Sequence, residues 1–333
     1  GKSTPKTSQT EKIFQQSQFY FFRKHYSILA ALFLEIFLEY SGIFILFFLA
    51  LFLRFFRLEE NFAFQGELGD NLLAIKNAIT KRQIPLLGPP TSHPWLYFGP
   101  LYYWLMIPLT IIFNFNPNFI DEESALAGIL GVVLNFMVIR RVFNQKTAYF
   151  SSFLIAVSPL FVGFSRSGRF MFWVTVLFYP LLWFLYQIWQ GKMRFLFWLG
   201  LVFGIMLSFH LTPLFLAPVI FIVFWKKRKL INKKWLFLGF LGFSIPNLSF
   251  FIDDVSHKFA MTTKFLIWLP YRFAGFLGFY PKNNLTKEVA KQTLREFYEF
   301  VSSSFVPEKE RMGILLTMAV VAFLFLKFKK GSF

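Results

Sequence analysis

SALAGILGVVLNFMVI (residues 124–139) is followed by RRVFNQK (140–146) and then by TAYFSSFLIAVSPLFVGF (147–164). Each apolar run approaches the roughly 20 residues that a helix needs to cross the hydrocarbon core of a bilayer. The short link between them carries two arginines and a lysine, which is typical of a loop on the cytoplasmic side of a membrane. This stretch therefore predicts two membrane-crossing helices joined by an inner loop.

The composition extends this prediction to the whole chain. Of 333 residues, 56% are hydrophobic and 16% are charged, whereas soluble domains average about 45–50% and about 25%. The mean hydropathy is +0.53. There are too few charges to cover a globule in water, so the composition excludes an ordinary soluble protein. Aromatic residues make up 22% of the chain, so a single ring is weak evidence for a binding site.

The net charge of +18 would suggest nucleic acid binding in a soluble protein. Here the cations gather in short links between apolar runs, as in KKRK (226–229) and KFKK (327–330). This placement indicates membrane topology, so we expect no nucleic-acid partner. The absence of cysteine excludes a disulfide framework, an iron–sulfur cluster and a thiol nucleophile.

The chain is predicted to be all-α, a polytopic membrane protein with about eight transmembrane helices. The candidate crossings cover residues 39–56, 124–139, 147–164, 170–189, 195–209, 212–225, 235–252 and 313–326. Residues 98–115 are also apolar, but they contain Pro100 and Pro108, which break or kink a helix. Because the basic links should share one side, this segment is expected to be interfacial or re-entrant on the outer side. The alternative is that it crosses and that a further crossing is hidden near residues 26–56.

This topology divides the chain into three parts. Residues 1–38 form a cytoplasmic N-terminal segment with an inner-surface helix, residues 39–326 form the membrane domain, and residues 327–333 form a cytoplasmic tail. Two outer loops are long, 58–121 and 253–311, and both should carry juxtamembrane helices. One is expected near residues 72–79, and another, with an apolar face, over residues 290–305. Long loops on one side suggest that the function lies there.

The first outer loop offers a pair of acids, Glu67 and Asp70, at the start of a predicted helix. Residues three apart share a helical face, so the two carboxylates could act as a general base or bind a cation such as Mg²⁺ or Mn²⁺. The alternative is that they only complement the helix dipole. The outer acids show no diagnostic metal-ligand spacing, so no cofactor is assigned.

Arginines on the outer side run against the usual distribution of charge. Arg166 and Arg169 follow the third predicted crossing, and a bound phosphate would explain them because the guanidinium group suits it. The alternative is that they extend their charges to the membrane surface. Further residues that could join the same anion site are His93, His210, Lys264 and Arg272.

Several segments together resemble a known family. They are LRFFRL (53–58) at the end of the first helix, Glu67 at a helix start, PLLGPPTS (85–92), GPLYY (99–103), and the pair Ser158 and Pro159 leading to Arg166. With His210 and Asp253, they are similar to multi-pass GT-C glycosyltransferases, specifically the bacterial family 39 relatives of protein O-mannosyltransferases and of the lipid A aminoarabinose transferase. The resemblance covers roughly residues 40–275.

The resemblance implies an enzyme of the plasma (inner) membrane and the cell envelope. It would move a sugar from a polyprenyl-phosphate donor to a hydroxyl of a lipid, glycan or protein, with its active site facing outside. By position, Glu67 would be the catalytic acid, with Asp70 beside it, and the basic residues would hold the donor phosphate. Relatives commonly have Asp in place of Glu67, often beside another acid, whereas here its neighbours are Gly66 and Leu68.

Two other functions remain open from the sequence. A transporter or flippase for an anionic lipid-linked substrate would use the same arginines as a pathway, but it should carry ionisable groups inside several crossings. A non-catalytic assembly subunit could share the scaffold. The predicted crossings after residue 60 contain almost no charges, which favours the transferase over the transporter.

Overall fold

The computed structural model describes residues 28–62 and 66–276, together with residues 20, 24, 279, 291–296 and 299. Within these residues all regular elements are helices, and strand pairing is limited to one isolated bridge between Pro90 and Tyr97. The predicted all-α class is therefore confirmed. The last predicted crossing (313–326), the tail (327–333) and most of the N-terminal segment and of the predicted helix over 290–305 lie outside the described residues.

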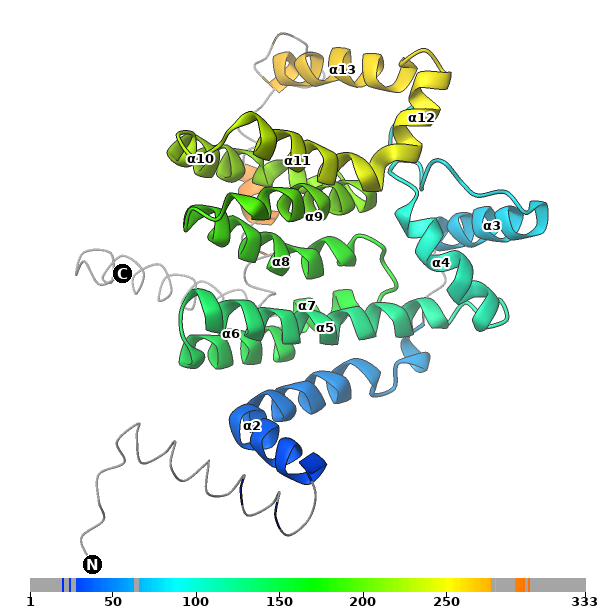
Figure 1. The fold of residues 1–333 in the computed structure, drawn as a ribbon. Helices are drawn as coiled ribbons and strands as arrows, with labels where there is room; N and C mark the ends of the chain where they lie inside the picture. Colours follow the sequence, from blue (N-terminus) through cyan, green and yellow to red (C-terminus); the bar gives the residue numbers. More distant parts are fainter. Residues whose placement is uncertain are drawn as a thin grey trace, which may run out of the picture.

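The described α-helices are α2 (Ile28–Phe55), α3 (Gly66–Lys81), α4 (Leu101–Ile112), α5 (Phe119–Val142), α6 (Gln145–Val157), α7 (Pro159–Ser165), α8 (Phe172–Trp189), α9 (Leu196–Phe209), α10 (Ala217–Lys227), α11 (Lys233–Ser244), α12 (Leu248–Ser256) and α13 (Ala260–Phe276). Short 3₁₀ turns separate some of them, including η3 (Thr212–Leu216) before α10. Helices α2, α5, α8, α9 and α11 lie side by side as a stack (Figure 1). Helices α3 and α4 pack together at one end of it.

Three described segments are long and apolar enough to cross a membrane: Phe119–Val142, Phe172–Trp189 and Lys233–Ser256. The pair α6 and α7 would add a fourth, but it is bent by 60° at its break. The protein therefore has membrane-spanning helices, whereas about eight crossings stays a prediction.

Two predicted crossings differ from the structure. Residues 147–164 are not one straight helix, because Pro159 has no N–H with which to continue the hydrogen bonds of α6. Residues 212–225 are not one helix either, since they divide into η3 and the 11-residue α10. Prolines at the start of both of these pieces explain the division.

Helix α4 lies within the segment whose path the sequence left open. Its 12 residues span about 18 Å, less than the roughly 30 Å of a hydrocarbon core. Pro108 stands inside it. Tyr102, Tyr103 and Met106 are buried, whereas Ile112 is 71% exposed. A short helix with one exposed apolar side favours the interfacial arrangement for this segment.

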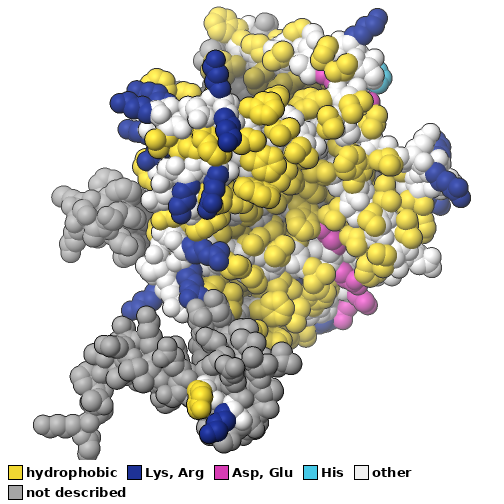
Figure 2. Space-filling view, viewed as in Figure 1, with side chains coloured by type: hydrophobic (Ala, Val, Ile, Leu, Met, Phe, Trp, Pro, Cys, Tyr) yellow, Lys and Arg dark blue, Asp and Glu magenta, His cyan; other side chains and the backbone are white. Residues whose placement is uncertain are grey.

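Charge is unevenly distributed over the stack. Many of the visible lysine and arginine side chains gather along one edge of the molecule, with others at the tip of α3, and Asp and Glu appear toward the side opposite that edge (Figure 2). We call the first the basic end; it holds the links 140–146, 190–195 and 226–234. The opposite end, which carries α3, α4 and the start of α5, we call the site end (Figure 1). The structure thus places the predicted inner links 140–146 and 226–229 at the same end, whereas the link 327–330 lies outside the described residues.

Candidate functional site

Helix α3 places the first predicted acid. Glu67 lies in the first turn of α3, and Asn71, one turn later, is buried. The Tyr103 hydroxyl of α4 donates a hydrogen bond to the Asn71 side-chain oxygen at 3.0 Å. Residues four apart share a helical face, so this bond orients Glu67 toward the same side as Asn71.

Glu67 lines a small cleft together with Arg169. The cleft has a volume of about 30 Å³, and its other walls come from α3, from Tyr102 and from the turn before α8. A space of this size holds a group about as large as a water molecule. Within the described residues, neither the Glu67 carboxylate nor the Arg169 guanidinium has a hydrogen-bond or ion-pair partner. Both charged groups are therefore available to a ligand.

A wider hollow of about 280 Å³ adjoins the cleft. It is lined by Pro159, Leu160, Phe164 and Arg169, so Arg169 borders both spaces, as Ser167 does. The Arg169 guanidinium carbon lies 5.6 Å from the centre of the Phe164 ring, which holds the charge beside an apolar wall. Both spaces combine polar and apolar walls, and they share Ser167 and Arg169.

The turn that carries Arg169 is shaped by Gly168. Its φ of +59° lies in the left-handed region, and a Cβ there would stand 2.6 Å from an Asp121 carboxylate oxygen. Glycine is therefore required both by conformation and by the close approach of α5. Asp121 is 5% exposed. The position of Ser167 and Arg169 consequently depends on the buried start of α5.

Arg166 binds the end of α2. Its guanidinium donates to the carbonyl oxygens of Leu53 at 2.9 Å and Arg57 at 3.2 Å. Leu53 lies in the last turn of α2, where backbone carbonyls lack helical partners. A cation also complements the negative end of the helix dipole there. Arg166 therefore joins the end of α7 to the end of α2.

Arg54 makes the reverse connection from α2. It is fully buried and donates to the carbonyls of Ile155 at 3.3 Å and Ala156 at 3.2 Å. In an unbroken helix these carbonyls would bond to residues 159 and 160, but Pro159 has no N–H and the helix bends there. Arg54 thus supplies the donors that the break removes. Arg54 and Arg166 with these four carbonyls form what we call the arginine clamp.

Some residues in or near the cleft were not singled out from the sequence. Tyr102 lines the cleft and is 1% exposed. The Trp173 indole N–H donates a hydrogen bond to the Glu123 carboxylate. In the sequence, GPLYY (99–103) contributed only to the family resemblance, and the three consecutive acids at 121–123 were assigned no role.

His210 lies at the end of α9, connected to the cleft through two rings. Its ring centre is 5.0 Å from that of Phe98, which is 5.7 Å from that of Phe170 on the cleft wall. The Thr212 backbone N–H donates to His210 Nδ1 at 3.2 Å, so the ring proton is on Nε2. Burial lowers the pKa of His210. The side chain is therefore neutral near pH 7.

The remaining predicted anion ligands gather around α13. The His93 ring centre lies 5.0 Å from that of Trp268, and the Arg272 guanidinium carbon lies 5.8 Å from the same indole. Lys264 is exposed and lies one turn before Trp268 on the same helical face. This group joins the first outer loop to α13, apart from the residues that line the cleft.

Of the predicted catalytic pair, only Glu67 lines the cleft; Asp70 is exposed and does not. Within the described part of the chain no three His, Asp or Glu side chains converge as a metal ion would require. The acids there do not fit a site built by the protein alone for Mg²⁺ or Mn²⁺.

Comparison with known protein families gives a match over the middle of the chain. The family model of dolichyl-phosphate-mannose-protein mannosyltransferase matches residues 92–250, a little under half of the chain. Arg166, Arg169, His93 and His210 lie inside the matched region, whereas Glu67 precedes it. No curated protein and no solved structure matches significantly. Over residues 92–250 the chain thus resembles the dolichyl-phosphate-mannose-protein mannosyltransferase family, which confirms its resemblance to membrane glycosyltransferases of the GT-C type.

Proposed function

We propose that the protein transfers a sugar from a polyprenyl-phosphate donor to a hydroxyl group of a lipid, glycan or protein at the site end of the stack. The observation that carries this proposal is that Glu67 and Arg169 line one cleft, and that within the described residues neither charged group has a hydrogen-bond or ion-pair partner. The site end would face the outside of the plasma (inner) membrane, because the basic end suits the cytoplasmic side.

In the proposed reaction the Glu67 carboxylate takes the proton of the acceptor hydroxyl as its oxygen attacks the anomeric carbon. The bond from that carbon to the phosphate oxygen breaks, and polyprenyl phosphate leaves. The leaving phosphate gains negative charge, which the Arg169 guanidinium stabilises. The apolar part of the wider hollow, formed by Pro159, Leu160 and Phe164, suits the first isoprene units of the donor. No step is assigned to a metal ion.

The arginine clamp speaks against the transporter alternative. A pathway for an anionic substrate needs ionisable groups that are accessible within the membrane. Arg54 is a fully buried cation near the end of α2, and its guanidinium donates hydrogen bonds to two carbonyls at the end of α6, next to the break. Its role in holding the helices together explains its position without a moving substrate.

The test is sugar transfer by the purified full chain in lipid nanodiscs. Polyprenyl-phosphate sugars are supplied with hydroxyl acceptors, and mass spectrometry follows the loss of sugar from the donor. Glu67→Gln removes the base and keeps the shape, so single-turnover transfer should fall by about 10²- to 10⁴-fold. Asp70→Asn is the matched control, since it neutralises an exposed acid three residues away on α3.

We expect Asp70→Asn to stay within a few-fold of the wild-type rate and Glu67→Asp to keep some transfer. A Glu67→Gln variant that transfers sugar at the wild-type rate would remove Glu67 from the mechanism. A folded wild-type chain that leaves every donor intact would favour the non-catalytic assembly subunit, for which the unusual neighbours Gly66 and Leu68 are the motivating observation.

A further inference from the structure

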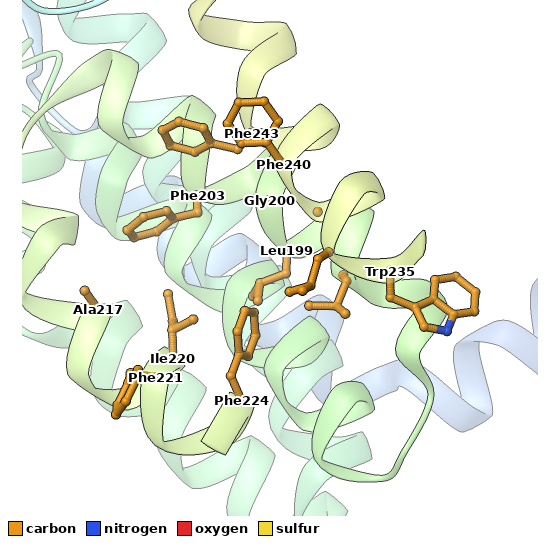
Figure 3. A pocket seen from close by; sticks show the side chains of 13 residues that line it. Leu199, Gly200, Phe203, Ala217, Ile220, Phe221, Phe224, Trp235, Phe240 and Phe243 are labelled. Carbon is orange, nitrogen blue, oxygen red and sulfur yellow. The ribbon is translucent and has the colours of Figure 1, made fainter. Parts of the chain in front are cut away.

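A second hollow lies among α9, α10 and α11 (Figure 3). Its volume is about 420 Å³, and it shares no residue with the cleft. The walls are aliphatic and aromatic, with Leu199, Phe203, Ile220, Phe224 and Trp235 among the residues that line it (Figure 3). We call it the apolar groove. Its lining can bind only a hydrocarbon or another apolar surface.

The groove exists because two of its helices approach each other closely and the third does not. A Cβ at Gly200 of α9 would stand 2.0 Å from the Gly239 carbonyl oxygen of α11, and one at Gly242 would stand 2.1 Å from the Phe197 carbonyl oxygen. Glycines therefore fix the contact between α9 and α11, as small residues do between membrane helices. Helix α10 has no buried residue. It stands off from this pair and leaves space.

One end of the groove meets the basic end of the molecule. Phe224 and Trp235 line the groove on either side of the link 226–234, which carries six cations and no acid: Lys226, Lys227, Arg228, Lys229, Lys233 and Lys234. The Lys234 ammonium lies 5.4 Å from the centre of the Trp235 ring, and the Lys227 ammonium lies 5.0 Å from that of Trp189. Within the described residues no carboxylate pairs with these cations. Their positive charge is therefore uncompensated beside an apolar hollow.

We propose that the apolar groove binds one acyl chain of an anionic phospholipid whose headgroup phosphate lies on the link 226–234. Bulk lipid tails are as apolar as the groove, so the walls can favour a bound acyl chain only through their shape. The cations of the link 226–234 then provide the preference for a negatively charged headgroup. A zwitterionic lipid has the same chains without the net charge. The site does not depend on the proposed transferase activity.

The first experiment identifies the lipid. The full chain is reconstituted in nanodiscs of phosphatidylcholine with a minority of phosphatidylglycerol, then transferred to mild detergent for native mass spectrometry. We expect one phosphatidylglycerol to remain bound, enriched about tenfold over its share of the bilayer. Phosphatidylglycerol carrying a diazirine on its acyl chain should label residues of α10 and α11 in the wild-type protein.

Variants then locate the site. Ile220→Trp fills the apolar groove, whereas Ile222→Trp makes the same change on α10 at a residue that is 55% exposed and does not line the groove. Phosphatidylglycerol should be lost from the first variant and kept by the second. Lys227→Gln with Lys234→Gln should reduce the preference over phosphatidylcholine by about tenfold, and Arg141→Gln with Lys146→Gln, in another basic link, should not.

Several outcomes would overturn the site. Equal retention of the two lipids would remove the role of the cations, and labelling outside α9, α10 and α11 would place the lipid elsewhere. Retention of no lipid would indicate that the chain itself fills the groove. Displacement of phosphatidylglycerol by added polyprenyl phosphate would assign the groove to the donor instead, whereas failure of sugar transfer alone leaves the lipid result intact.

Discussion

The arginine clamp and the cleft lie on either side of the turn after α7. The charged side chains of the clamp are hydrogen-bonded to backbone carbonyls, whereas those of the cleft are not. In the clamp, Arg54 and Arg166 donate to carbonyls at the ends of α6 and α2. In the cleft, Arg169 and Glu67 have no such partners within the described residues. The comparison separates two arginines that donate to carbonyls at helix ends from one arginine that can bind a ligand. Substitutions in the clamp should therefore change the free energy of unfolding, whereas substitutions in the cleft should change donor binding.

The largest effect on stability is expected from Arg54→Met. Methionine has a side chain of similar length but no charge and no N–H groups, so the carbonyls of Ile155 and Ala156 lose their donors. Each unsatisfied buried carbonyl costs about 1–3 kcal/mol, and relief from burying a charge offsets part of that loss. We expect unfolding to become easier by about 2–4 kcal/mol, measured as thermal or denaturant unfolding in detergent.

The matched variant is Arg54→Lys, which keeps the charge but cannot place donors on two carbonyls with a planar group. It should fall between the wild type and Arg54→Met. If Arg54→Met is as stable as the wild type, the hydrogen bonds of Arg54 do not contribute to the free energy of unfolding. Only Arg166 would then remain as a stabilising residue of the clamp.

The next prediction compares two arginines three residues apart. Arg169→Gln should leave unfolding unchanged and weaken donor binding by about 10- to 100-fold, as expected for lost hydrogen bonds to a charged group. Arg166→Gln should destabilise the protein by about 1–2 kcal/mol, because the carbonyls of Leu53 and Arg57 lose a charged donor. Equilibrium binding of a polyprenyl-phosphate sugar and unfolding are measured on both variants. If Arg169→Gln destabilised the protein and Arg166→Gln weakened donor binding, the roles assigned to the two arginines would be wrong.

Parts of the fold follow directly from the sequence because they depend on local pattern. The span Phe119–Val142 extends the predicted run 124–139, and α3 contains the predicted helical stretch 72–79. The bend at Pro159 has a local cause but was not predicted, because an apolar run of 18 residues looks like one crossing. The clamp could not be predicted at all, since Arg54 and Ala156 lie 102 residues apart.

Of the candidate site, only the charged residues could be predicted from the sequence. Glu67 and Arg169 stood out because an acid at a helix start and an arginine on the outer side are unusual in so apolar a chain. Nothing in the sequence brought these two residues together or placed Tyr102 in the same cleft, since that arrangement depends on how α3 and α4 pack against the start of α8. For the same reason the sequence could not separate Arg166 from Arg169.

Gly168→Ala tests how the turn between clamp and cleft is held. The new Cβ would need a left-handed backbone and would stand 2.6 Å from an Asp121 oxygen, so we expect a loss of about 1–2 kcal/mol and weaker donor binding. Gly163→Ala is the matched control for unfolding alone, because a Cβ at that residue of α7 meets nothing within 4 Å, whereas Gly163 itself lines the wider hollow proposed for the donor. It should be neutral or stabilising by up to about 1 kcal/mol in α7. Equal effects of the two substitutions would mean that the turn is not constrained by Asp121.

The smallest expected effect concerns His210, whose pKa is lowered by burial. The unfolded chain then binds a proton at a higher pH than the folded protein does, so stability falls as pH decreases below the ordinary value of about 6.5. The loss ends below the folded pKa, where both states are protonated. His210→Gln should unfold with a flatter pH dependence between pH 7.5 and 6 than the wild type does. Because Nδ1 accepts from the Thr212 N–H in the neutral ring, protonation also removes that bond and strengthens the same trend. A variant with the wild-type slope would show that the proton is bound equally well in both states.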